Sequence, residues 1–331
     1  MTTDTVAPTG VPQTPMKAML VRNIPTARSA GILVPFIILF AVLSVGSGSF
    51  LTKPNLLNIL DQQSATLIMA AAGTLVLISG GLDLSVGATY ALAGVVAAQT
   101  AQHHGVLPAV LLALLVGLAI GVVNGFISTV CRINSLIATL SMSFIVSGVA
   151  SKVTNGNLIV LTSQPHFAKI AQTTFLTVRT SIWIALAALI VLGVVLSRST
   201  LGRYLYAAGG NPTAARLAGV RVTGVRIAAF AASGTAAAAA GVIDTSRVLS
   251  AQSSSGQTLA FTVLAGIVVG GTSILGGEGA IWRTVLGVLF IALVGNGFDL
   301  LGVNPLYQQI TLGFILLVAV GLDAWTRTDR R

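Results

Sequence analysis

The sequence predicts an all-α fold, a polytopic bundle of about ten transmembrane helices. Of its 331 residues, 54% are apolar and only 8% are charged, whereas a soluble domain carries roughly 25% charged residues. The apolar residues also gather into runs long enough to cross the hydrocarbon core of a membrane, which takes about 20 residues of helix. None of the runs alternates as the roughly ten-residue strands of a transmembrane barrel do, so helices are predicted.

Ten apolar runs are candidate spans, and roughly nine to eleven crossings fit them, because several runs are shorter than a full span. They cover residues 31–45, 57–79, 85–98, 107–130, 136–149, 182–196, 227–243, 259–274, 285–300 and 306–322. Residues 1–28 are rich in Pro and Thr and are predicted to form a disordered cytoplasmic tail. The transmembrane domain is therefore expected at residues 29–326.

The formal net charge of +10 comes from basic residues in the connecting segments, so no nucleic-acid partner is expected. With the N-terminus inside and ten spans, thirteen basic residues face the cytoplasm and five face outward. The thirteen are Lys17, Arg22, Arg28, Arg132, Arg198, Arg203, Arg216, Arg221, Arg226, Arg283, Arg327, Arg330 and Arg331. The five are Lys53, Lys152, Lys169, Arg179 and Arg247. This asymmetry follows the positive-inside rule and predicts that both termini are cytoplasmic.

A short sequence echo links the earlier and later spans. Asn124-Gly125-Phe126 precedes Ile133-Asn134-Ser135-Leu136, and Asn296-Gly297-Phe298 precedes Val303-Asn304-Pro305-Leu306. On the predicted topology the two copies run in opposite directions, as in the inverted repeats of many transporters. A chance match among the abundant glycines is the alternative. In such transporters the pathway lies between the repeats, so Asn124 and Asn296 are candidate pathway or gating residues.

The chain lacks the motifs of a catalytic or metal centre. None of its four lysines follows glycines in the pattern of a phosphate-binding loop. The histidines, His103, His104 and His166, lie in predicted outer loops without the carboxylate or cysteine neighbours of a metal site. We therefore expect no catalytic residue, no metal and no cofactor, and a membrane enzyme is the weakest reading.

Carboxylates near apolar runs are functional suspects, because charge at membrane depth is costly. They are Asp61, Asp83, Asp244, Asp299 and Asp323. None lies at the middle of a span with a basic partner, which argues against proton coupling but leaves Asp61 and Asp83 open to it. Asp83, beside Gly80, Gly81 and Gly87, is predicted to cap the next helix by accepting free backbone N–H groups. With Asn124 and Asn296, it is also a candidate pathway or gating residue.

The longest cytoplasmic segment, residues 197–226, contains a short helix with defined ends. Asn211 suits the N-cap, Pro212 the first helical position and Gly219 the residue just past the C-terminus. The helix of about 10 Å would present Ala214, Leu217 and Ala218 alongside Arg216. It is either an ordinary connector or a segment that fits a groove on a partner.

Taken together, the segments between the spans resemble the permeases of bacterial ABC importers for ribose, xylose, galactose and related sugars. The resemblance covers residues from about 50 to 310, in the order of the family. Its most specific blocks are Gly80-Gly81-Leu82-Asp83-Leu84-Ser85-Val86-Gly87 and Gly209-Gly210-Asn211 followed by Ala214-Ala215-Arg216-Leu217-Ala218-Gly219. Weaker ones are Phe50-Leu51-Thr52, Asn55-Leu56-Leu57-Asn58, Gly270-Gly271-Thr272-Ser273 and Gly276-Gly277-Glu278-Gly279.

The resemblance implies a non-catalytic permease of the bacterial inner membrane with the fold of the vitamin-B12 permease. It implies a second copy of the chain, lipid around it, an ABC ATPase subunit below it, and a periplasmic binding protein that delivers a sugar. The ATPase-coupling helix would comprise Asn211, Pro212, Ala215, Arg216, Leu217 and Gly219. The family usually carries acidic residues where this chain has Ala260 and Thr262, which leaves the identity of the solute open. An ion-coupled secondary transporter of a small polar solute is the alternative function.

Overall fold

The structure, a computed structural model, describes residues 31–304 and 306–328, the last seven of these by their backbone alone. The predicted tail at residues 1–28 lies outside the described residues. Each of the ten predicted spans overlaps a helix. These helices are α3 (Leu33–Gly46), α4 (Lys53–Ile78), α5 (Val86–His104), α6 (Val106–Thr129), α7 (Ser135–Thr154), α9 (Thr180–Arg198), α12 (Val222–Val248), α13 (Leu259–Val269), α14 (Ile281–Leu300) and α15 (Leu306–Thr328).

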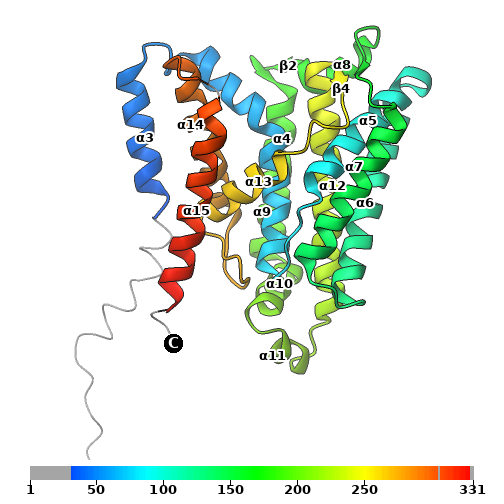
Figure 1. Cartoon of the computed structure of the whole chain (residues 1–331), viewed down its shortest axis with the longest axis vertical. Coiled ribbons are helices and arrows are strands. Elements are labelled where there is room, and N and C mark those ends of the chain that lie inside the picture. The colour runs from blue at the N-terminus through cyan, green and yellow to red at the C-terminus, as the bar shows by residue number, and fades with distance from the viewer. Residues whose placement is uncertain (1–30, 305, 329–331) are drawn as a thin grey trace, which may run out of the picture.

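Shorter elements close the two ends of the bundle (Figure 1). Helix α8 (Pro165–Gln172) and the strands lie at one end, where β1 (Ile159–Val160) pairs antiparallel with β4 (Ser250–Ala251). Strands β2 (Thr174–Phe175) and β3 (Val178–Arg179) form a hairpin there. Helices α10 (Thr200–Gly210) and α11 (Pro212–Leu217) lie at the opposite end. The predicted all-α polytopic bundle is confirmed.

Among the described helices, α6, α7, α9, α12 and α14 are long and apolar enough to cross a membrane by themselves. Helices α4 and α5 are enclosed by the others instead. Every residue of α4 from Ser64 to Ile78 is buried, and its contacts lie mainly with α12, α9, α14 and α13. A helix that faces protein on all sides can carry Ser, Thr and Gly, because it does not have to dissolve in lipid.

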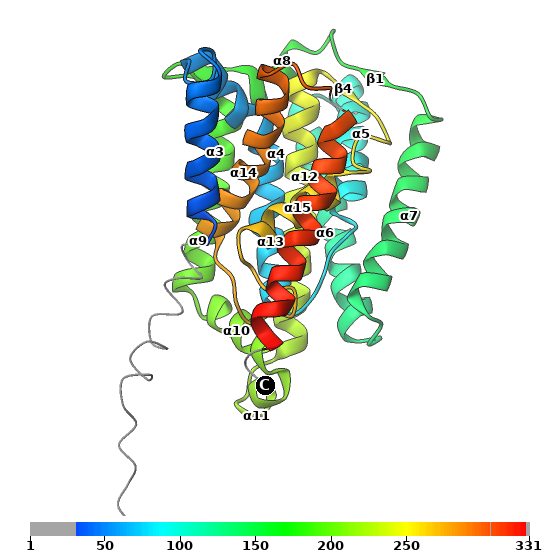
Figure 2. The same cartoon turned by 60° about the vertical axis from the view of Figure 1, so that its left-hand side comes forward.

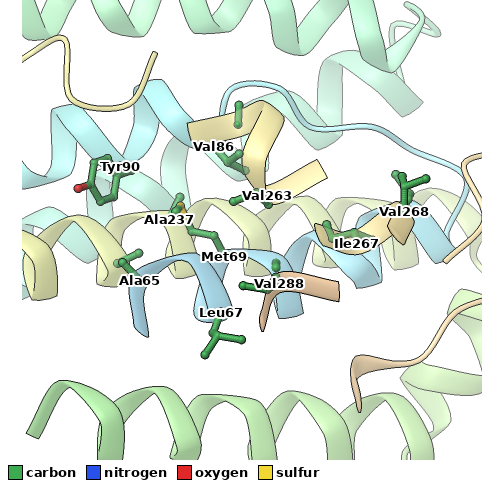
Figure 3. Packing of buried hydrophobic residues seen from close by; sticks show 14 of the residues in the cluster. Ala65, Leu67, Met69, Val86, Tyr90, Ala237, Val263, Ile267, Val268 and Val288 are labelled. Atoms are coloured by element: carbon green, nitrogen blue, oxygen red, sulfur yellow. The ribbon is translucent and has the colours of Figure 1, made fainter. Parts of the chain in front are cut away.

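The core between α4, α5, α12 and α13 is built from small and medium apolar side chains (Figure 3). Met69 of α4 is fully buried, and Ala237 of α12 and Val263 of α13 pack in the same cluster. Glycines bring α6 against α12: a Cβ atom on Gly121 would lie 2.3 Å from the carbonyl oxygen of Phe230. In a membrane, lipid tails are as apolar as the side chains, so no hydrophobic effect drives helices together. Helices associate there through close van der Waals packing, which small residues such as glycine allow.

Helix α13 corrects the predicted eighth span, residues 259–274. It has 11 residues, about 16 Å of helix at 1.5 Å per residue, and cannot cross a core of roughly 30 Å. The helix stops at Val269 because Gly270 packs against the backbone of Arg283 and Gly271 adopts φ +80°. Residues 270–280 continue without helix toward α10, as both views show (Figures 1 and 2).

The order of elements repeats, with opposite chain direction. Helix α4, an extended segment at residues 79–85, and α5–α7 correspond to α12, an irregular segment at residues 249–258, and α13–α15. Helix α6 runs toward the end that carries α10 and α11, whereas α14 runs away from it (Figure 1). Asn124 and Asn296 occupy matching positions near the C-terminal ends of α6 and α14. The order and direction of these helices fit the inverted repeat that the sequence echo predicts.

Candidate functional site

The extended segment at residues 79–85 runs through the bundle between α4 and α5. Backbone polar groups at membrane depth need partners inside the protein, and side chains of two helices supply them. Ser135 and Thr139 of α7 accept from the N–H groups of Leu82 and Leu84, at 3.0 and 3.1 Å. Arg226 of α12 donates to the carbonyl oxygen of Ser79 at 2.9 Å. The segment is thus held by α7 and α12 together.

Asp83 lies in this segment, and hydroxyl groups surround its carboxylate. One oxygen accepts from the backbone N–H and the hydroxyl of Ser85, at 3.0 and 2.7 Å, and the other from the Ser233 hydroxyl at 2.8 Å. The predicted helix cap is wrong in detail. Ser85 is itself the N-cap of α5, so Asp83 closes the turn before the helix and ties it to α12.

Asn124, the second predicted gating residue, belongs to the same network. Its side-chain nitrogen donates to the Ser85 hydroxyl at 2.7 Å, and the residue is fully buried. Its side-chain oxygen has no hydrogen-bond partner among the described residues. Asp83 and Asn124 therefore act on the same turn, through Ser85, although 41 positions separate them in the sequence.

Asn296 lies elsewhere, at a polar cavity near the end of the bundle that carries α8. The cavity has a volume of about 530 Å³ and lies between α4, α14 and α15, with Thr258 and Thr262 at its edge. Seven amide side chains line it: Asn55, Asn58, Gln62, Gln63, Asn296, Gln308 and Gln309. We call it the outer cavity. Thr262, noted above as a departure from the family, faces it, whereas Ala260 is buried in the core.

Most of the outer cavity was missed in the sequence analysis, although a signal for it exists. Asn55, Asn58 and Gln62 recur at intervals of three and four residues, which places them on one face of a helix. The following residues of α4 are almost all apolar or small. A stripe of amides at the start of such a helix indicates a polar lining rather than a lipid-facing surface.

Two carboxylates have basic partners that were not predicted from the sequence. Buried Asp61 of α4 pairs with Arg179 at 2.8 Å and accepts a short hydrogen bond from Ser181. Asp244 of α12 accepts from Arg247, one turn later, at 2.9 and 2.5 Å, and from the Tyr90 hydroxyl. The second pair was detectable as Asp and Arg at i and i+3. Both lie at the α8 end of the bundle and join neighbouring segments there.

The predicted short helix is present as α11. The Asn211 side chain accepts from the N–H groups of Thr213 and Ala214, at 3.1 and 3.0 Å, and Pro212 takes the first position. Gly219 follows with φ +84°. Ala215 is buried against α10 and α12, whereas the Leu217 side chain is 87% exposed. Helix α11 thus presents an exposed apolar side chain at the end of the molecule that carries α10 and α11.

Three glycine-containing segments meet just above α11. A Cβ atom on Gly209 of α10 would lie 1.8 Å from the carbonyl oxygen of Ile78, and one on Gly276 would lie 2.8 Å from the Cα of Gly80. Tyr206 of α10 donates to the carbonyl oxygen of Gly279 at 2.8 Å. Burial raises the pKa of this phenol above its usual value, so it remains a donor. Helix α10 is thus in direct contact with the start of the segment at residues 79–85 and with the segment at residues 270–280.

Comparison with known proteins agrees with this architecture. Residues 55–320 match the family described as branched-chain amino acid transport system / permease component. The chain is 38% identical to the ribose import permease protein RbsC of Escherichia coli over 295 residues, 88% of this chain and 92% of that protein. It is 39% identical to RbsC of Bacillus subtilis over 289 residues, 86% and 89% of the two chains.

A relative that is named for a different sugar matches over a similar share of the chain. The L-arabinose ABC transporter permease protein AraH of Azospirillum brasilense is 37% identical over 306 residues, 91% of this chain and 89% of that protein. No solved structure matches the chain. The family match and these relatives span nearly all of the described helices. The chain therefore belongs to the branched-chain amino acid transport system / permease component family and is a multi-pass, non-catalytic permease of the ABC transporter class.

Proposed function

We propose that the chain is the membrane subunit of an ABC importer that carries ribose, xylose or a related monosaccharide through the outer cavity. The observation that carries the proposal is the set of seven amides around a space of about 530 Å³. An amide side chain donates and accepts hydrogen bonds, and so does each hydroxyl of a sugar. Such a lining can therefore supply the hydrogen bonds that a sugar makes to water in solution. The relatives named for ribose and L-arabinose support a monosaccharide.

The coupling step is assigned to α11. Its exposed Leu217 and neighbouring Arg216 form a contact for a groove on the ABC ATPase subunit, as a helix-in-groove interaction. Movement of α11 reaches α10 directly, and Gly209 of α10 lies against the end of α4 and residues 276–277. ATP binding and hydrolysis would then shift the two non-helical segments, one of which holds Asp83 and Asn124 together. These residues are gating residues in this scheme, and Asn296 is a pathway residue.

The remaining partners follow from the exposed surfaces. The α8 end, close to the outer cavity, receives sugar from the periplasmic binding protein. Exposed apolar side chains on α15, such as Phe314 and Leu317 at 66% and 71% exposure, face lipid or a second copy of the chain. Two copies enclose the complete pathway in the inner membrane, with both termini in the cytoplasm.

The orientation is tested by labelling single cysteines in a chain that carries Cys131→Ser. Leu217, at the α11 end, and Leu176, in the β2–β3 turn, are both strongly exposed. A difference in labelling between Leu217→Cys and Leu176→Cys therefore reports the side of the membrane on which each cysteine lies. An impermeant maleimide added to intact cells should label position 176 and not position 217. Labelling at 217 would reverse the topology and remove α11 from the ATPase side.

The sugar pathway is tested by uptake into vesicles that contain the permease, its ATPase and its binding protein. Gln62→Leu and Gln308→Leu each remove an amide from the outer cavity while keeping side-chain size, and should lower uptake about tenfold or more. Gln102→Leu, at the exposed end of α5 and outside the cavity, is the matched control. Normal uptake by both cavity variants would contradict the proposed pathway.

A further inference from the structure

A second large cavity lies at the opposite end of the molecule, beside α11. It has a volume of about 810 Å³ and is lined from α6, α7, α11 and α12. This size lies within the range of roughly 300–1,000 Å³ typical of small-molecule sites. Three arginines line it, Arg132, Arg216 and Arg226, and none of its lining residues is acidic. We call it the basic cavity.

None of the three arginines forms an ion pair with a described residue. The two ion pairs found among the described residues use Arg179 and Arg247, at the other end of the bundle. Arg216 and Arg226 line the same cavity from different helices, α11 and α12. Clustered guanidinium groups without carboxylates are the arrangement by which proteins bind phosphate, since each fork can donate two parallel hydrogen bonds.

Neutral donors surround the same space. Ser128 and Thr129 from the end of α6, and Asn134 and Ser135 from the start of α7, line the cavity with the arginines. The Ser128 hydroxyl is buried and has no hydrogen-bond partner among the described residues. Arg132 itself adopts φ +58°, a left-handed conformation that is uncommon for a residue with a side chain. Backbone of this kind tends to occur at binding sites.

An apolar surface continues directly from the basic cavity. Phe126, Val130, Ile133 and Leu136 are 49%, 48%, 45% and 45% exposed, and Ile133 also lines the cavity. These side chains belong to the end of α6, the start of α7 and the turn between them, two helices of membrane-spanning length. The occupant must therefore offer a phosphate-like anion at one end and apolar chains at the other.

We propose that the basic cavity binds the headgroup of an anionic phospholipid, with the acyl chains on the exposed faces of α6 and α7. Basic pockets between transmembrane helices bind such headgroups on the cytoplasmic side of membranes, the side proposed here for α11. The phosphate oxygens accept hydrogen bonds from Arg132 and Arg216. Arg226 adds charge while it holds the carbonyl oxygens of Ser79 and Ala208, at 2.9 and 3.4 Å. Bound lipid would thus touch α11 and the segment before α5 at once.

The test uses the purified permease alone, so its failure would leave the proposed transport function untouched. Native mass spectrometry measures retention of added phosphatidylglycerol and phosphatidylcholine. The wild-type protein should bind phosphatidylglycerol at least about tenfold more tightly, and Arg132→Gln or Arg216→Gln should each weaken that binding about tenfold. Neither substitution should change the binding of phosphatidylcholine. Arg203→Gln, exposed on α10 outside the cavity, is the matched control.

Several results would overturn the assignment. One is equal retention of the two lipids by the wild-type protein, and another is unchanged phosphatidylglycerol binding in both cavity variants. Displacement of the lipid by an equal concentration of inorganic phosphate would show that the site reads a free anion and not a lipid. Arg132→Lys keeps the positive charge but loses the guanidinium group that donates two parallel hydrogen bonds. Its affinity for phosphatidylglycerol should lie between those of the wild-type protein and Arg132→Gln. Unchanged thermal unfolding of the Gln variants shows that lost binding is not lost folding, and Arg216, on exposed α11, provides the variant least coupled to the core.

Discussion

Asn55 and Asn296 exchange two amide hydrogen bonds, of 3.1 and 2.9 Å, between the first turn of α4 and the last turns of α14. The Asn55 nitrogen also donates to the carbonyl oxygen of Phe50 at 2.9 Å. Helices from the two halves of the inverted repeat are thereby joined at the edge of the outer cavity. The pair gives the cavity a fixed wall, because neither amide can rotate without losing two contacts.

Asn296→Ala should destabilise the protein by about 1–3 kcal/mol, because it leaves a partly buried amide without its partner. Asn55→Ala should cost at least as much, since the bond to Phe50 is lost too. The double substitution should cost less than the sum of the two, because both single changes break the same pair. Thermal unfolding of the purified permease measures all three. Additive effects would mean that the two amides do not interact.

Asp83→Asn should be tolerated better than Asp83→Ala. The Asn oxygen can still accept from Ser85, and the Ser233 hydroxyl can turn to accept from the new amide. Alanine leaves all three donors of the network unpaired, at about 1–3 kcal/mol for each buried group. Melting temperature and sugar uptake, compared across the three proteins, test this order. Equal loss of uptake with Asn and Ala, together with a change in its pH dependence, would instead assign Asp83 to proton coupling.

Gly209→Ala should prevent normal packing of α10, whereas Gly210→Ala should be nearly neutral. The new Cβ at position 209 would overlap the Ile78 carbonyl oxygen at 1.8 Å, and a backbone atom cannot move aside as a side-chain end can. At position 210 no atom lies within 4 Å of the new methyl group. The neighbouring substitution thus controls for helix propensity. Gly209→Ala should lower expression, thermal stability and ATPase stimulation, and Gly210→Ala should leave all three near the wild-type level. Similar values for the two variants would show that Gly209 does not need its close contact with Ile78.

Leu217→Asp should abolish co-purification of the ATPase with the permease. It places a charge on an apolar contact face, and a buried charge without a partner costs several kcal/mol, or orders of magnitude in affinity at 1.4 kcal/mol per tenfold. Arg216→Glu should act in the same direction by reversing charge. Leu176→Asp is the control, because this leucine is also exposed, at 71%, but lies at the opposite end. A normal yield of ATPase with both α11 variants would reduce α11 to a connector.

Residue pattern predicted most of the helices and the caps of α11, because each depends on neighbours close in sequence. Residue pattern did not predict the features that depend on contacts between segments distant in sequence. Helix α13 stops early because Gly270 meets Arg283, and Asp83 binds Ser233, 150 positions away. The outer cavity joins Asn55 to Asn296 across 241 positions, so no local pattern could assemble it. The vitamin-B12-permease type of fold stays a prediction.

We propose that ATP, and not an ion gradient, drives a sugar through this chain. Asp83 has both carboxylate oxygens occupied by hydroxyl donors, and the relatives are ABC permeases. Uptake of labelled ribose or xylose by sealed vesicles, with ATPase and binding protein present, measures the claim directly. It should require ATP and the binding protein, and should persist when ionophores remove every ion gradient. Uptake that proceeds without ATP and collapses with the ionophores would contradict the account and assign the chain to the ion-coupled transporters.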